Sequence, residues 1–84
     1  MIKTHELKIE PKYFKEVINE TKKFELRKDD REFVVGDELI LREFDNNSYT
    51  GNSCKVKVTY KLNGGQYGLD IGYCILSIEL IKVI

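Results

Sequence analysis

Three charged residues near position 25 have the types and spacing to form a binding or catalytic site. Lys22, Glu25 and Arg27 follow one another within six residues. Side chains of a strand alternate between its two faces, so Glu25 and Arg27 would share one face of a strand that begins after Lys22. A carboxylate can orient a guanidinium while leaving some of its five donors free for an anion. The lysine adds a point charge suited to a phosphate.

The surrounding segment, residues 19–44, has the pattern of two strands joined by a charged connection. Phe24 and Leu26 alternate with the charged positions, and apolar residues return at 39–41. Val35-Gly36-Asp37 predicts a turn before the second strand, because glycine adopts backbone angles closed to other residues and aspartate caps turns through its side chain.

Further strands are predicted at 5–9, 54–62 and 73–83, where apolar and polar residues alternate. Residues 45–48, together with Gly51-Asn52, have the residue types of turns and predict a hairpin tip between two strand patterns. The 54–62 strand has three lysines on the face that we expect to be solvated: Lys55, Lys57 and Lys61. Such lysines solubilise a sheet or protect its edge more often than they contact nucleic acid.

One amphipathic helix is predicted before the central segment. Pro11 suits the first turn of a helix. Four apolar residues follow at helical spacing: Tyr13, Phe14, Val17 and Ile18. We expect the helix to end near 19–21 and its aromatic pair to pack in the core rather than contact a ligand.

The motif Lys22-x-x-Glu25-x-Arg27, followed by Val35-Gly36-Asp37, resembles the ASCH domain family, whose members are small β-barrels of the PUA-like class. Further likeness to a small ASCH-like family of bacterial and phage proteins lies at His5-Glu6-Leu7-Lys8, Tyr67-Gly68-Leu69 and Gly72-Tyr73. The family motif usually opens with glycine two residues before the lysine, and here that position is Glu20. The resemblance implies an α+β fold, a mostly antiparallel barrel of five to six strands with one packed helix.

Composition sets the limits for this fold. At 84 residues, 1–84 would form a single domain able to bury roughly 60 to 65 % of its unfolded surface. Fourteen basic and fourteen acidic residues cancel, so attraction to nucleic acid or to an anionic membrane has to come from local patches. No apolar run approaches the ~20 residues of a membrane span, and charges occupy the place of a signal peptide's apolar segment. We therefore expect a cytosolic protein that does not act on membranes.

Metal and cofactor sites are not expected. Cys54 and Cys74 share their strand parity with apolar neighbours, and one histidine is too few for a Cys/His metal cluster. We expect buried, reduced thiols, with a disulfide as the alternative. The glycines match neither a phosphate loop nor a dinucleotide fingerprint.

The first functional hypothesis is an RNA- or nucleotide-binding module, as the resemblance implies. Its cleft would have a basic rim of Lys22, Arg27, Lys28 and Arg31 around Glu25, with Tyr67 or Tyr73 on the opposite wall to stack a base. Solvated ion pairs with Glu25, Asp29 and Asp30 are the competing interpretation. His5 would point toward the core or the barrel mouth, where packing is a more common role for a lone histidine than catalysis.

Two further hypotheses belong to other classes. As in some ASCH members, the protein would hydrolyse modified nucleosides or RNA, with Lys22 as base or nucleophile and Glu25 relaying protons. Against this, residues 63–72 form a short connection with Asp70 as its sole acid, whereas the amidohydrolase-like members have a longer helical segment and a further acid. Alternatively, a protein partner would bind a strand edge or the acidic hairpin at 43–50.

Overall fold

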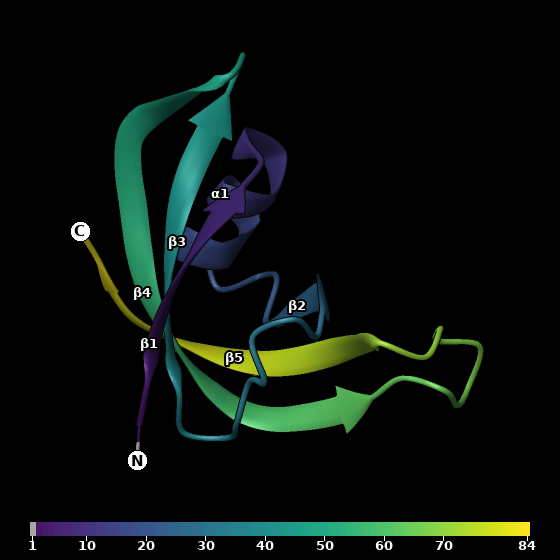
Figure 1. Ribbon diagram of the computed structural model, residues 1–84. Helices are drawn as coiled ribbons and strands as arrows, with labels where there is room; N and C mark the ends of the chain where they lie inside the picture. Colours follow the sequence, from purple (N-terminus) through teal and green to yellow (C-terminus); the bar gives the residue numbers. More distant parts are fainter. Residues whose placement is uncertain (1) are drawn as a thin grey trace.

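Residues 2–84 form a small α+β protein with one curled five-stranded sheet and one short helix in the computed structural model (Figure 1). The elements in chain order are β1 (Thr4–Ile9), α1 (Pro11–Ile18), β2 (Phe24–Lys28), β3 (Glu38–Asp45), β4 (Ser48–Asn63) and β5 (Tyr73–Val83). The predicted α+β class, the helix starting at Pro11 and a strand at each predicted place are confirmed. The prediction of turn structure at Gly51-Asn52 is wrong, because β4 already begins at Ser48 and pairs with β3 there. None of the helices described for residues 2–84 has the length and apolar character to cross a membrane.

The sheet is mixed and does not close into the barrel that we expected. Its strand order is β1-β3-β4-β5-β2, with β1 parallel to β3 and the other pairings antiparallel. β1 and β2 are therefore the two edges. A closing ladder would bring their backbones to about 4.8 Å, whereas charged side chains lie in the gap: Arg27 donates to the Lys8 carbonyl at 2.7 Å and Arg31 to the Glu6 carbonyl at 2.9 Å. The result is a half-barrel in which Arg27 of β2 and Arg31 of the connection after β2 both reach the edge of β1.

The sheet curls around α1, which packs against β3 and β5 (Figure 1), and the core includes Phe14 and Val17 of this helix. The buried apolar side chains of the core are Leu7, Ile9, Phe14, Val17, Phe33, Leu39, Leu41, Cys54, Val56, Val58, Cys74, Leu76 and Ile78. Both cysteines are buried and free, as predicted. Burial, with a smaller contribution from the Glu25 carboxylate, raises the pKa of the Cys54 thiol to about 11, which keeps this thiol protonated at neutral pH.

One of the three lysines of β4 does not lie on the solvated face. The register against β5 shifts between Val58 and Tyr60, and such a bulge changes the face on which the following side chains lie. Lys61 turns inward, 2.7 Å from the Asp29 carboxylate, and donates to the Phe33 carbonyl at 2.8 Å. Tyr60, at an apolar position of the alternation, is instead 63 % exposed.

The predicted turn at 35–37 is present and holds the start of β1 in place. Asp37, which is 2 % exposed, accepts hydrogen bonds from the backbone amides of Lys3 and Val34, both at 3.1 Å. Its carboxylate also accepts from His5 Nε2 at 2.9 Å. His5 is buried and packs edge-on against the Phe33 ring, with centroids 4.9 Å apart. This buried pair connects β1 to the turn before β3.

From the His5–Asp37 pair we predict that the protein loses stability in acid. Burial raises the pKa of Asp37, but the His5 and backbone hydrogen bonds outweigh it and hold the pKa below its ordinary value of 3.8. A carboxyl group whose pKa is lowered by folding stabilises the fold above its unfolded pKa, and this contribution disappears as the pH falls through the folded value. We therefore expect the wild-type free energy of unfolding, measured in urea, to fall below pH 3.8 partly through this group.

Asp37→Asn should lower the free energy of unfolding at pH 7 by about 1 to 3 kcal/mol and flatten its decline in acid. Asp70→Asn, at an exposed position, is the matched control and should follow the wild-type curve. An Asp37→Asn curve that runs parallel to the wild type throughout acid would contradict this assignment.

Candidate binding cleft between the sheet edges

A buried carboxylate held by two cations lies on β2. Glu25 is 3 % exposed. Lys22 Nζ donates to Glu25 Oε1 at 2.6 Å, and Arg27 Nε donates to Oε2 at 2.9 Å with Nη2 2.8 Å from the same oxygen. An ionised carboxylate is costly to bury unless it is paired and hydrogen-bonded, and here both oxygens are engaged. The group has a net charge of one positive unit.

The faces of β2 are the reverse of the usual apolar-in, polar-out arrangement. Glu25 and Arg27 share a face, and this face points inward, whereas Phe24 and Leu26 are 49 % and 54 % exposed. The inward cations reach backbone oxygens as well as Glu25. Lys22 Nζ donates to the Phe24 carbonyl at 2.7 Å, and Arg27 Nη2 reaches the edge of β1. These contacts satisfy the charges that the reversed strand buries.

A cleft of about 410 Å³ opens beside this group, between the end of β1, α1 and β2. Its lining residues are Lys8, Ile9, Glu10, Tyr13, Lys22, Phe24, Glu25, Leu26 and Arg27. The Lys22 ammonium is 5.5 Å from the Tyr13 ring centroid and 4.7 Å from that of Phe24. Among residues 2–84, neither the third Lys22 proton nor Arg27 Nη1 has a hydrogen-bond partner. The cleft therefore combines free cationic donors with exposed rings.

Of the predicted site residues, Lys22, Glu25 and Arg27 lie together in the cleft. The others lie outside its lining: His5, Lys28, Arg31, Tyr67 and Tyr73. Tyr67, expected on the opposite wall, is 88 % exposed in the loop after β4, and Arg31 donates from the connection after β2 to the Glu6 carbonyl of β1. The loop lies at the end of the long β4–β5 hairpin that points away from α1 (Figure 1), and its tyrosine is not among the residues that line the cleft.

Tyr13 forms the wall that was assigned to Tyr67. It is 41 % exposed, whereas its neighbour Phe14 is buried, so the expectation that both rings pack in the core is wrong for Tyr13. Successive residues of a helix project about 100° apart, so Tyr13 lies at one edge of the apolar stripe and Phe14 lies nearer its middle. This helical periodicity was the feature of the sequence that could have predicted an exposed Tyr13.

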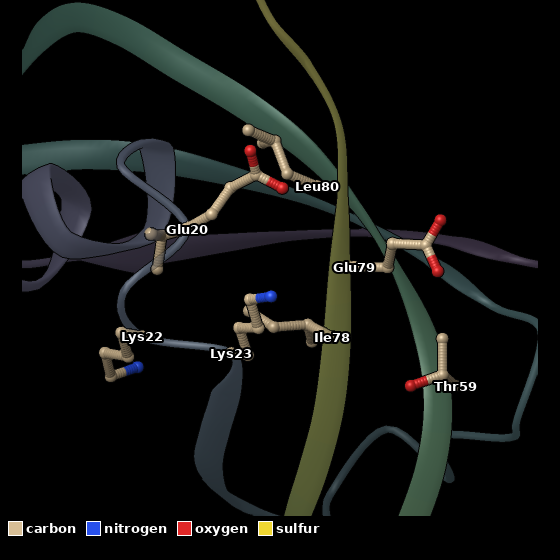
Figure 2. Close-up of a pocket in the computed structure, with 8 residues that line it drawn as sticks. Glu20, Lys22, Lys23, Thr59, Ile78, Glu79 and Leu80 are labelled. Carbon is tan, nitrogen blue, oxygen red and sulfur yellow. The ribbon is translucent and has the colours of Figure 1, made fainter.

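A second cavity of about 170 Å³ lies near the end of α1 and the middle of β5. Figure 2 shows Glu20, Lys22 and Lys23 on the segment after the helix, facing β5, with Glu79 and Thr59 beyond this strand. Two acids (Glu20 and Glu79) and two bases (Lys22 and Lys23) line this smaller cavity, and within residues 2–84 no aromatic ring does. The larger cleft is therefore the better candidate site.

The carboxylate and the lysine of the cleft are engaged with neighbouring groups. Glu25 has both oxygens engaged by cations, and Lys22 directs two protons at oxygen acceptors. A general base needs a free lone pair within reach of the substrate, as does a nucleophilic amine. Within residues 2–84 no group of three or more His, Cys, Asp or Glu side chains could hold a metal ion.

Comparison with known proteins identifies relatives without an assigned activity. The family described as "Domain of unknown function (DUF3850)" matches residues 4–78, a range that includes every residue of the cleft. The "Uncharacterized 12.9 kDa protein in GpA 3'region" of Escherichia phage P2 is 41% identical over 59 residues, which are 70% of this chain and 54% of that protein. The chain thus spans about half the length of this curated relative.

Removing the charge of Glu25 should destabilise the fold. Glu25→Gln leaves Lys22 and Arg27 close together without their anion, and breaking a buried ion pair is strongly destabilising. Because the lysine and arginine side chains are 15% and 23% exposed, solvent screens part of the effect. We expect a loss of about 2 to 4 kcal/mol in the free energy of unfolding, measured in urea.

Glu38→Gln is the matched control, since the Glu38–Lys55 pair is longer, at 3.4 Å, and about a third exposed. Glu38→Gln should lower the free energy of unfolding by less than about 1 kcal/mol. Equal losses in the two variants would show that Glu25 has no special structural role.

Proposed function

We propose a ligand-binding function for this chain, which belongs to the DUF3850 family: it binds RNA or a nucleotide in the cleft between β1, α1 and β2. The observation that supports this proposal is the meeting of two cations, fixed on buried Glu25, with the exposed rings of Tyr13 and Phe24. Cationic donors suit a phosphate, and an exposed ring suits a base. The cleft volume of about 410 Å³ is within the range of small-ligand sites, about 300 to 1,000 Å³.

The charges favour a ligand with few phosphates at this cleft. The whole chain has no net charge, so long-range steering does not contribute to binding. Locally, three bases (Lys8, Lys22 and Arg27) and two acids (Glu10 and Glu25) line the cleft, which leaves one excess positive charge. The Glu10 carboxylate would repel a second phosphate but can accept a hydrogen bond from the amino group of a base. A nucleotide unit satisfies both requirements.

Assignment of the fold to the ASCH-type, PUA-like class is part of the proposal. Two observations support it. The three residues of the ASCH-like motif converge on one cleft of a curled sheet. Glu20, at the motif position usually occupied by glycine, has a φ of 61°, in the left-handed region that glycine adopts without strain. The backbone thus has the conformation that favours glycine in the motif.

Replacement of Tyr13 tests the proposal more cleanly than replacement of Arg27. Arg27 also holds Glu25 and the β1 edge, so its loss would disturb the fold. Tyr13→Ala removes an exposed ring from a helix, where alanine is well tolerated. We expect binding of labelled single-stranded RNA or a nucleotide, measured by fluorescence anisotropy, to weaken by about 1 to 3 kcal/mol with little change in melting temperature.

Tyr67→Ala is the matched control, because this tyrosine is exposed and lies outside the cleft. It should bind like the wild type. A titration panel of single-stranded RNA, duplex RNA, DNA and free nucleotides over a salt series identifies the ligand class. Equal behaviour of the two variants would contradict the assignment of the cleft, and absence of wild-type binding across the panel would end the proposal. Mass spectrometry of the same samples tests the alternative function, because it would detect hydrolysis of the RNA or the nucleotides.

A further inference from the structure

A second group of cations and aromatic rings lies on the β3–β4 hairpin and the adjacent end of β1. We call it the hairpin cluster; its members are Lys8, Arg42, Phe44 and Tyr49. Lys8 Nζ is 4.4 Å from the Phe44 ring centroid, and the Arg42 guanidinium carbon is 3.8 Å from that of Tyr49. The two rings meet edge to face with centroids 5.1 Å apart. Tyr49 is 44% exposed and the Arg42 side chain 41%, so both are accessible to a ligand.

The hairpin cluster is continuous with the cleft. Lys8 belongs to both, because it lines the cleft and its ammonium lies over the Phe44 ring. Its carbonyl accepts the hydrogen bond from Arg27 that bridges the sheet edges. Lys8 and Arg42 are partners in the parallel β1–β3 register, as are Phe44 and Tyr49 in the β3–β4 pairing. A path of alternating charge and ring therefore runs from β2 across β1 to the hairpin.

From this continuity we infer that the ligand is a single-stranded nucleic acid, which extends from the nucleotide in the cleft across β1 and β3 onto the hairpin cluster. The inference rests on the proposed function of the cleft. Unpaired bases have free faces for stacking on Tyr49 and its stacked guanidinium, and Lys8 lies between the two ring groups, where a linking phosphate would pass. The paired bases of a duplex offer no such faces.

Carboxylates along the path limit how many phosphates it holds. Glu6 lies 3.3 Å from Arg42, and Glu43 accepts hydrogen bonds from Thr50 at 2.7 Å and Asn52 at 3.1 Å. The cations of the path are Lys8, Arg42, Lys22 and Arg27. With four cations, the slope of log affinity against log salt should be no steeper than about −3 for a single strand.

The test compares ligand lengths. Affinities of labelled oligonucleotides of one, two, four and about eight residues are measured for the wild type and Tyr49→Ala. Wild-type affinity should rise with length and then level off when the path is filled. Tyr49→Ala should bind the mononucleotide like the wild type and the longest oligonucleotide about tenfold more weakly. Tyr60→Ala, at an exposed tyrosine further along β4, is the matched control and should follow the wild type.

The outcomes separate this inference from the proposed function. Mononucleotide binding without any gain from length would overturn the extended path and leave the cleft assignment standing. If the wild type binds neither short nor long ligands, both fail. A Tyr49→Ala variant that only melts earlier, with binding unchanged at every length, would show that the hairpin cluster braces the hairpin and would also overturn the inference. Ribose and deoxyribose versions of each oligonucleotide show whether the 2′-hydroxyl is read.

Discussion

The ion pairs of the buried Glu25 carboxylate determine how β2 lies in the structure. Glu25 can be buried because Lys22 and Arg27 engage both of its oxygens. With this charged face inward, Phe24 and Leu26 are turned outward and become walls of the cleft. The interaction therefore fixes the positions of the cations and the apolar walls together.

Arg27 and Arg31 explain why the sheet remains a half-barrel. β1 and β2 are its edges; Arg27 of β2 donates to the Lys8 carbonyl of β1, and Arg31, in the connection after β2, donates to the Glu6 carbonyl. A backbone ladder would have excluded both the side chains and the cleft. The arginine side chains supply hydrogen-bond donors to two carbonyls of the β1 edge. They also leave the cleft open at the end of β1.

A protein without net charge can concentrate cations only locally, and here it does so by pairing them with rings. Lys22 lies over Tyr13 and Phe24, Lys8 over Phe44, and Arg42 over Tyr49. Cation–π contact orders long side chains without neutralising them. The DUF3850 match at residues 4–78 contains both the cleft and the hairpin cluster, so the two surfaces are parts of the same family domain.

Local patterns in the sequence determined the elements of this protein. Pro11 marks the helix start, alternation marks the strands, and Gly36-Asp37 marks the turn, because each depends on neighbouring residues. The tertiary structure alone decided that β1 pairs in parallel with β3 and that the charged face of β2 points inward. Alternation has the same period whichever face is buried. The choice depends on partners distant in sequence, such as the Lys8 carbonyl for Arg27, and the same dependence placed Tyr13 rather than Tyr67 beside the cations.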